Sequence, residues 1–177
     1  MAEIIIVDEK DDIIGYKERR YVERDNIYRV SALWITNSKG DVLLAKRGLN
    51  KRNNPGKWGP AVAGTVEKGE DYETNIIKEA KEELGLEDIK FNQGLKIRVS
   101  GDSEAGHNFF CQWFTLNIDK PSGDFKIQQE ELEEVGWFSV SELINLLKEK
   151  SDEFIPSMKK HLKLFYEPHF PEEKIKF

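Results

Sequence analysis

Residues 64–86 read GTVEKGEDYETNIIKEAKEELGL, and this stretch carries the clearest helix in the chain. We expect the helix over 71–84, because Asp71 can cap its first turn and Gly85 suits a left-handed stop. At about 100° per residue, one arc of this helix is apolar and should face the core. The arc is formed by Tyr72, Ile76, Ile77, Ala80 and Leu84. The stretch therefore predicts a loop, an amphipathic helix and a second loop.

Three carboxylates share a neighbouring face of the same helix. Glu79, Glu82 and Glu83 are spaced i, i+3 and i+4, so they lie side by side and repel one another. Lys78 and Lys81 relieve only part of that repulsion. A hard divalent cation would turn it into binding, since Mg²⁺ prefers carboxylate oxygens. The alternative is an acidic face that is only solvated.

The spacing of this stretch resembles the Nudix box, whose pattern is G-x5-E-x7-R-E-U-x-E-E-x-G-U, where U is aliphatic. Two positions depart from it: Ala80 holds the first U position, and Lys78 stands where the family has arginine. The matching residues are Gly64, Glu70, Glu79, Glu82, Glu83, Gly85 and Leu86. The strands before the box and the segment from Glu131 to Phe138 also fit a Nudix domain.

The resemblance implies a phosphoanhydride hydrolase that uses Mg²⁺ or Mn²⁺. The cation would be held by Glu79, Glu82, Glu83 and the carbonyl of Gly64, and the glutamates would also be catalytic. Glu70 would brace the box by pairing with Lys78, although a lysine offers a point charge where arginine makes a two-pronged bond. The substrate would be a nucleoside diphosphate derivative or a related organic diphosphate.

Residues outside the box complete the predicted site. Glu131 stands six residues before Trp137, where Nudix chains often carry a further catalytic glutamate, although an acidic loop is the alternative. Arg47 and Lys51, with the following Pro-Gly-Lys-Trp, resemble the branch that contains isopentenyl-diphosphate isomerases. In that branch Arg47 and Lys51 would contact diphosphate, and solvated loop charges are the alternative for these two. Arg29 is a third candidate for substrate binding.

Two rival functions follow from the same resemblance. The isomerases need a cysteine on the strand that leads into the box and a metal-binding histidine two residues later, and Ala63 and Thr65 stand there. Because a methyl group cannot move a proton, we favour the hydrolase over the isomerase. A non-catalytic module that binds a nucleotide or a protein is disfavoured, since it has no need of three clustered carboxylates.

The remaining pattern sets the fold class. Apolar strand patterns at 4–7, 30–36, 41–45, 61–66, 94–99, 108–118 and 135–138 mix with helices at 71–84, 139–150 and 154–166, which indicates an α/β or α+β chain. The resemblance narrows this to an α/β fold, a Nudix-type α/β/α sandwich with a mixed central sheet. We expect a single domain over 1–177, with an N-terminal extension over about 1–28, the box at 64–86, and a C-terminal helix and tail at 151–177.

Composition excludes other classes. The 177 residues suit one domain, and 27 basic against 33 acidic residues argue against nucleic acid as the main partner. One cysteine, Cys111, excludes an internal disulfide. No apolar run approaches the ~18–20 residues that span a bilayer, so we expect a cytoplasmic protein without membrane contact. The expected partner is a small diphosphate, and the resemblance leaves a homodimer open.

Overall fold

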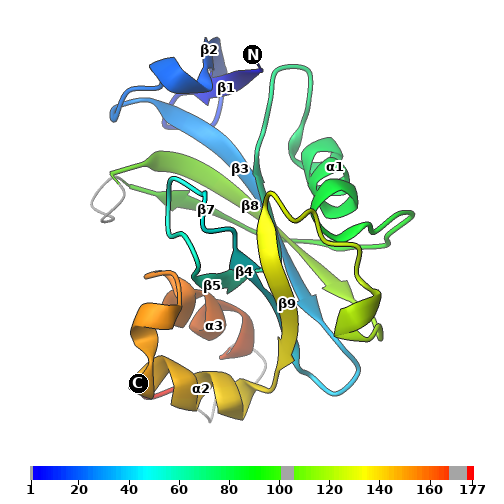
Figure 1. Cartoon of the computed structure of the whole chain (residues 1–177). Coiled ribbons are helices and arrows are strands. Elements are labelled where there is room, and N and C mark those ends of the chain that lie inside the picture. The colour runs from blue at the N-terminus through cyan, green and yellow to red at the C-terminus, as the bar shows by residue number, and fades with distance from the viewer. Residues whose placement is uncertain (1, 101–105, 168–174) are drawn as a thin grey trace. The chain divides into compact units, whose positions relative to one another are not determined.

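The computed structural model describes residues 2–100, 106–167 and 175–177. Part of the predicted tail, residues 168–174, lies outside them. The chain divides into two compact units, Met1–Trp34 with Val62–Asn117, and Ile35–Ala61 with Ile118–Phe177. Figure 1 labels most of the helices and strands of both units.

The first unit is built mainly on antiparallel strand pairs. Strand β1 (Glu3–Val7) pairs with β2 (Ile13–Glu18) and with β3 (Ile27–Thr36). A short 3-10 turn, η1 (Arg19–Tyr21), follows β2. Strand β3 also pairs with β6 (Val62–Thr65), which sets Gly64 opposite Ser31. Strand β8 (Asn108–Asn117) pairs with β3 and with β7 (Asn92–Val99).

Helix α1 (Tyr72–Leu84) follows β6 and packs against it. Asp71 accepts the Thr74 amide at 2.8 Å and donates its own amide to Thr74 Oγ1 at 2.8 Å, which closes a capping box. Gly85 ends the helix in the left-handed region at φ 64°. The predicted helix and both of its end signals are confirmed.

The buried face of α1 differs from the predicted one. Ile77, expected in the core, is 47% exposed, whereas Asn75 is fully buried. The hydrogen bonds of Asn75 to Ser31 and to the Thr65 carbonyl turn the helix toward β6. Ile77 stands at the opposite edge of the apolar arc and is therefore turned outward.

The second unit holds the remaining strands and two helices. Strand β4 (Val42–Arg47) lies between β5 (Trp58–Pro60) and β9 (Leu132–Phe138), antiparallel to both. The turn at 37–40 joins β3 to β4, with Gly40 at φ 82° and Thr36 opposite Val42. Short 3-10 turns are η2 (Ser122–Asp124) and η3 (Ser151–Glu153).

The two helices of this unit are α2 (Val140–Glu149) and α3 (Met158–Tyr166). Helix α3 begins later than the predicted residue 154. Phe154 is extended at φ −115° and ψ 156° and forms a parallel bridge with Trp58. Pro156 follows closely and disfavours helical backbone at Ile155. The predicted helix was therefore one turn too long at its start.

Antiparallel ladders with a parallel bridge, together with helices, give the predicted α/β class with a mixed sheet. In the part of the chain that the structure describes, no helix combines the length and the apolar character needed to cross a membrane.

Candidate active site

Gly64 allows a box carboxylate to lie directly on strand β6. A Cβ atom at this position would stand 2.3 Å from Glu79 Cδ and 2.4 Å from its Oε1. No side chain tolerates such contacts, so only glycine lets Glu79 approach the strand backbone this closely. The predicted first ligand and the predicted carbonyl ligand are therefore neighbours.

The other two box glutamates differ in exposure. Glu83 is half-buried, and its Oε2 accepts the amide of Ala63 at 3.4 Å, while Glu82 is exposed. Burial raises the pKa of Glu79, and the negative charges of Glu82, Glu70 and Glu67 raise it further against the opposing effect of Lys78. This end of α1 thus carries a surplus of negative charge.

An ion pair ties the start of the box loop to the helix. Lys78 Nζ lies 2.7 Å from Glu70 Oε1 and 3.3 Å from Glu67 Oε2. The amide of Glu67 donates to Glu70 Oε2 at 2.9 Å. Burial alone would raise the pKa of Glu70, but these bonds outweigh it and hold that pKa below its ordinary value. Lys78 therefore meets the predicted partner, and it meets Glu67 as well.

Asn75 is a central residue that the sequence reasoning missed. Its Nδ2 donates to Glu70 Oε2 at 2.9 Å and to the Thr65 carbonyl at 3.2 Å, and Glu79 Oε1 lies 3.4 Å away. Its Oδ1 accepts the hydroxyl of Ser31. The sequence signal that points to Asn75 is a polar side chain directly beside the apolar arc of the helix. A side-chain amide that is buried at such a position must be hydrogen-bonded.

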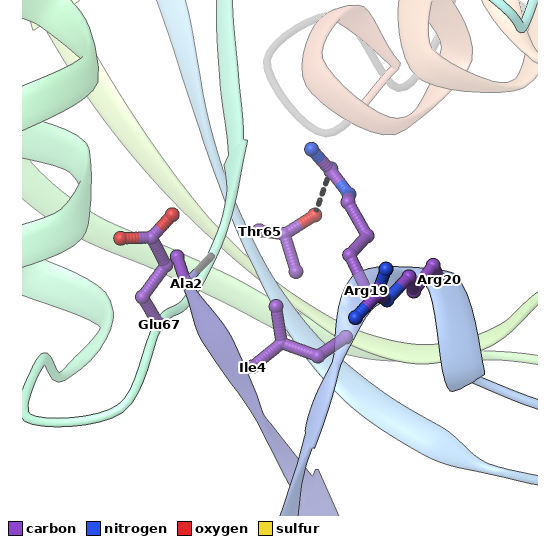
Figure 2. A pocket seen from close by; sticks show the side chains of 6 residues that line it. All are labelled: Ala2, Ile4, Arg19, Arg20, Thr65 and Glu67. Carbon is purple, nitrogen blue, oxygen red and sulfur yellow. Dashed lines mark hydrogen bonds between the residues drawn. The ribbon is translucent and has the colours of Figure 1, made fainter.

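A pocket of about 260 Å³ lies beside β6 (Figure 2). The guanidinium of Arg19 donates to Thr65 Oγ1 at 2.7 Å, one residue after Gly64. Arg20 pairs with Glu18 at 2.9 Å. The pocket is lined by Ala2, Ile4, Arg19, Arg20, Thr65 and Glu67. Neither arginine is among the site residues predicted from the sequence.

The remaining predicted site residues fall into two groups. In the second unit, Lys51 forms an ion pair with Glu131, and the Gly48 amide donates to the Glu131 carbonyl at 2.8 Å. Arg47 Nε donates to the Asn53 carbonyl at 3.0 Å. In the first unit, Arg29 Nε donates to Asp11 at 2.7 Å, and its side chain is only 15% exposed. The substrate contacts of these basic residues and the catalytic role of Glu131 stay predictions.

The donor set of the box suits a hard divalent cation. It consists of carboxylate oxygens and a backbone carbonyl, with no sulfur or imidazole among the predicted ligands. Among residues 2–100, 106–167 and 175–177, no three acidic, histidine or cysteine side chains converge into a preformed cage. The chemistry of the donors therefore fits such a cation, while the predicted ligand set itself stays a prediction.

Comparison with known proteins identifies the family of the chain. A model of the NUDIX domain matches residues 26–159. An uncharacterised Nudix hydrolase of Yersinia pestis is 29% identical over 166 residues, which cover 90% of this chain and 83% of the relative. An isopentenyl-diphosphate Delta-isomerase of an Enterobacter species is 24% identical over 163 residues, which cover 88% of this chain and 86% of that enzyme.

Solved structures share the fold. The DR0079 protein of Deinococcus radiodurans superposes with a TM-score of 0.78 at 20% identity, over 93% of this chain and 99% of that one. The NUDIX domain of Shewanella oneidensis NrtR, solved with ADP ribose, gives 0.64 at 13% identity, over 86% and 94%. The predicted fold class and family resemblance are confirmed. The chain belongs to the NUDIX domain family and is a hydrolase of that family.

Proposed function

We propose that this Nudix hydrolase cleaves a phosphoanhydride bond in a nucleoside diphosphate derivative or a related organic diphosphate, with Mg²⁺ or Mn²⁺ as cofactor. The observation that carries the proposal is the close approach of the Glu79 side chain to Gly64, which brings a box carboxylate against the backbone of strand β6. Glu82 and Glu83 follow on the next turn of the same helix.

The residues of the box have distinct roles in this proposal. Glu79, Glu82, Glu83 and the Gly64 carbonyl hold the cation, which when bound neutralises phosphate charge and activates a water. The raised pKa of Glu79 agrees with a carboxylate that needs a positive partner. Lys78 and Glu70 keep the loop and helix together, so the carboxylates are presented in a fixed arrangement.

The pocket beside β6 supports an anionic substrate. Arg19 brings a positive charge to Thr65, next to the proposed carbonyl ligand, and Ile4 and Ala2 give the same pocket an apolar side. A diphosphate joined to a less polar group has matching character. Arg47 and Lys51 are proposed to add phosphate contacts, and Glu131 to serve as a further catalytic carboxylate.

Isomerisation of isopentenyl diphosphate is the second candidate, because a relative of 24% identity is named an isopentenyl-diphosphate Delta-isomerase. Position 63 argues against it. Ala63 pairs with Ala32 across the strands and is exposed, and its methyl group offers no proton donor or acceptor. Thr65 stands two residues on and bonds Arg19.

A substrate screen tests the proposal. The full chain is incubated with nucleoside diphosphate derivatives, dinucleoside polyphosphates and prenyl diphosphates, with Mg²⁺, Mn²⁺ or chelator, and phosphate or nucleotide release is measured. We expect cation-dependent cleavage of at least one compound, and cleavage by Glu82→Gln that is slower by at least ~10²-fold under the same conditions. Cleavage that persists in chelator, or that keeps a near-normal rate in Glu82→Gln, contradicts the proposed site.

A further inference from the structure

Asp11 is a buried carboxylate in the turn between β1 and β2. The residue is 7% exposed and has left-handed backbone at φ 68°. Such backbone is uncommon for residues with Cβ, although Asp and Asn adopt it more readily than the others.

Three elements supply those contacts. Arg29 of β3 donates to Asp11 Oδ1 at 2.7 Å, and Lys96 of β7 reaches Oδ2 at 2.6 Å. The hydroxyl of Tyr72, the first residue of α1, lies 3.1 Å from both carboxylate oxygens. These two cations and the hydroxyl offset the cost of burying the Asp11 carboxylate. Removing its negative charge would leave Arg29 and Lys96 without a counter-charge.

The partners of Asp11 stand at both ends of the box loop. Tyr72 starts the helix after the loop, and the Arg29 carbonyl accepts the amide of Val66, just before the loop, at 2.9 Å. The Tyr72 ring packs on a small buried cluster of Ile5, Val7, Ile27 and Val66. Between these two ends lie Glu67 and Glu70, which pair with Lys78.

We propose that Asp11 is a positioning residue for the box. It fixes the start of α1 against the end of β6, so that Glu79 meets Gly64 and the box glutamates keep the spacing that a divalent cation requires. Asp11 precedes residue 26, where the match to the family begins, so the N-terminal extension supplies this support. The inference rests on the proposed function, in which these glutamates hold the cation.

The test measures Mn²⁺ binding to the full chain by electron paramagnetic resonance, without substrate. Asp11→Asn keeps the shape of the side chain and tolerates left-handed backbone, but it removes the charge. We expect the Mn²⁺ dissociation constant to rise about 10-fold, as for losses of outer-shell support at metal sites. Tyr72→Phe, which removes only the hydroxyl, should also raise the Mn²⁺ dissociation constant, but by a smaller factor.

The matched control is Glu9→Gln in the same turn. Glu9 pairs with Arg98 at 3.1 Å but is exposed, so its loss should leave the dissociation constant unchanged. A purely structural role would lower the unfolding temperature of Asp11→Asn without changing Mn²⁺ affinity, and that result overturns the inference. If Asp11→Asn does not fold, Tyr72→Phe becomes the test of the inference. Wild-type Mn²⁺ affinity in Tyr72→Phe then also overturns the inference.

A second readout separates this inference from the proposed function. Amide hydrogen exchange over 66–84 is measured without metal in wild type, Asp11→Asn and Glu9→Gln. Faster exchange in Asp11→Asn alone supports positioning, and equal exchange in all three contradicts it. If wild type binds no Mn²⁺, the proposed cation site is wrong. The hydrogen-exchange result then still tests whether Asp11 positions the box.

Discussion

Lys78 Nζ lies 2.7 Å from Glu70 Oε1, which joins the middle of helix α1 to the loop before it. Arginine is the usual residue at this box position, and its planar fork can bond both carboxylate oxygens. In this chain Glu70 Oε2 is bonded by the Glu67 amide and by Asn75, at 2.9 Å each. Neighbouring groups thus supply the second bond that lysine cannot.

This arrangement predicts the behaviour of variants at position 78. Lys78→Ala leaves Glu70 and Glu67 without their cation, so the loop should loosen and Mg²⁺ should activate only at about 10-fold higher concentration. Lys78→Arg should stay within about 2-fold of wild type, because the charge is kept. The measurement is the half-saturating Mg²⁺ concentration. Equal values for all three proteins would remove the ion pair from the account of the site.

The box glutamates should be required for rate and dispensable for folding. Glu82→Gln and Glu83→Gln should each lower kcat by at least ~10²-fold, the usual loss for a group that stabilises transition-state charge. Glu82 is exposed and Glu83 half-buried, so the fold should survive both changes. Turnover and far-ultraviolet circular dichroism are measured together. Near-normal turnover in both would mean that this face of α1 is only solvated.

Stability should depend on pH through His161 in α3. Burial lowers the pKa of His161 to about 4 from its ordinary 6.5. The unfolded chain then binds more protons between these values, so stability is full above about 6.5 and falls as pH drops toward 4. The loss amounts to at most about 3 kcal/mol. Urea unfolding at several pH values measures it.

His161→Leu is the control for that dependence. The variant cannot take up the proton, so its stability should fall less than that of wild type over the same pH range. Identical pH profiles for the two proteins would assign the acid sensitivity to other groups.

The hydrolase and the isomerase are separated by proton exchange. With Ala63 in place of a proton-transferring side chain, no deuterium should enter isopentenyl diphosphate from deuterated water, even at high enzyme concentration. Under the same conditions a nucleoside diphosphate derivative should be cleaved when Mg²⁺ is present. Mass spectrometry follows both reactions. Deuterium in the prenyl substrate would overturn the assignment, whatever hydrolysis was also seen.

Local chemistry let the sequence determine the elements of this fold. The cap at Asp71 and the left-handed stop at Gly85 depend on neighbouring residues, and both are present as expected. Helix α3 starts late because Pro156 disfavours helical backbone at Ile155 and because Phe154 bridges to Trp58, a residue far away in the chain. The proline is a local signal, whereas the bridge to Trp58 leaves no periodic trace in the sequence.

The box motif likewise identified the family, because its spacing fixes which side chains share one helix face. The supports of the box came only from the tertiary structure. Three sets of hydrogen bonds join segments that are distant in the sequence. Asn75 of α1 bonds the Thr65 carbonyl, and Arg19 bonds the Thr65 hydroxyl. Asp11 bonds Arg29, Tyr72 and Lys96. Burial and hydrogen bonding across strands decide such contacts, and no spacing along the chain encodes them.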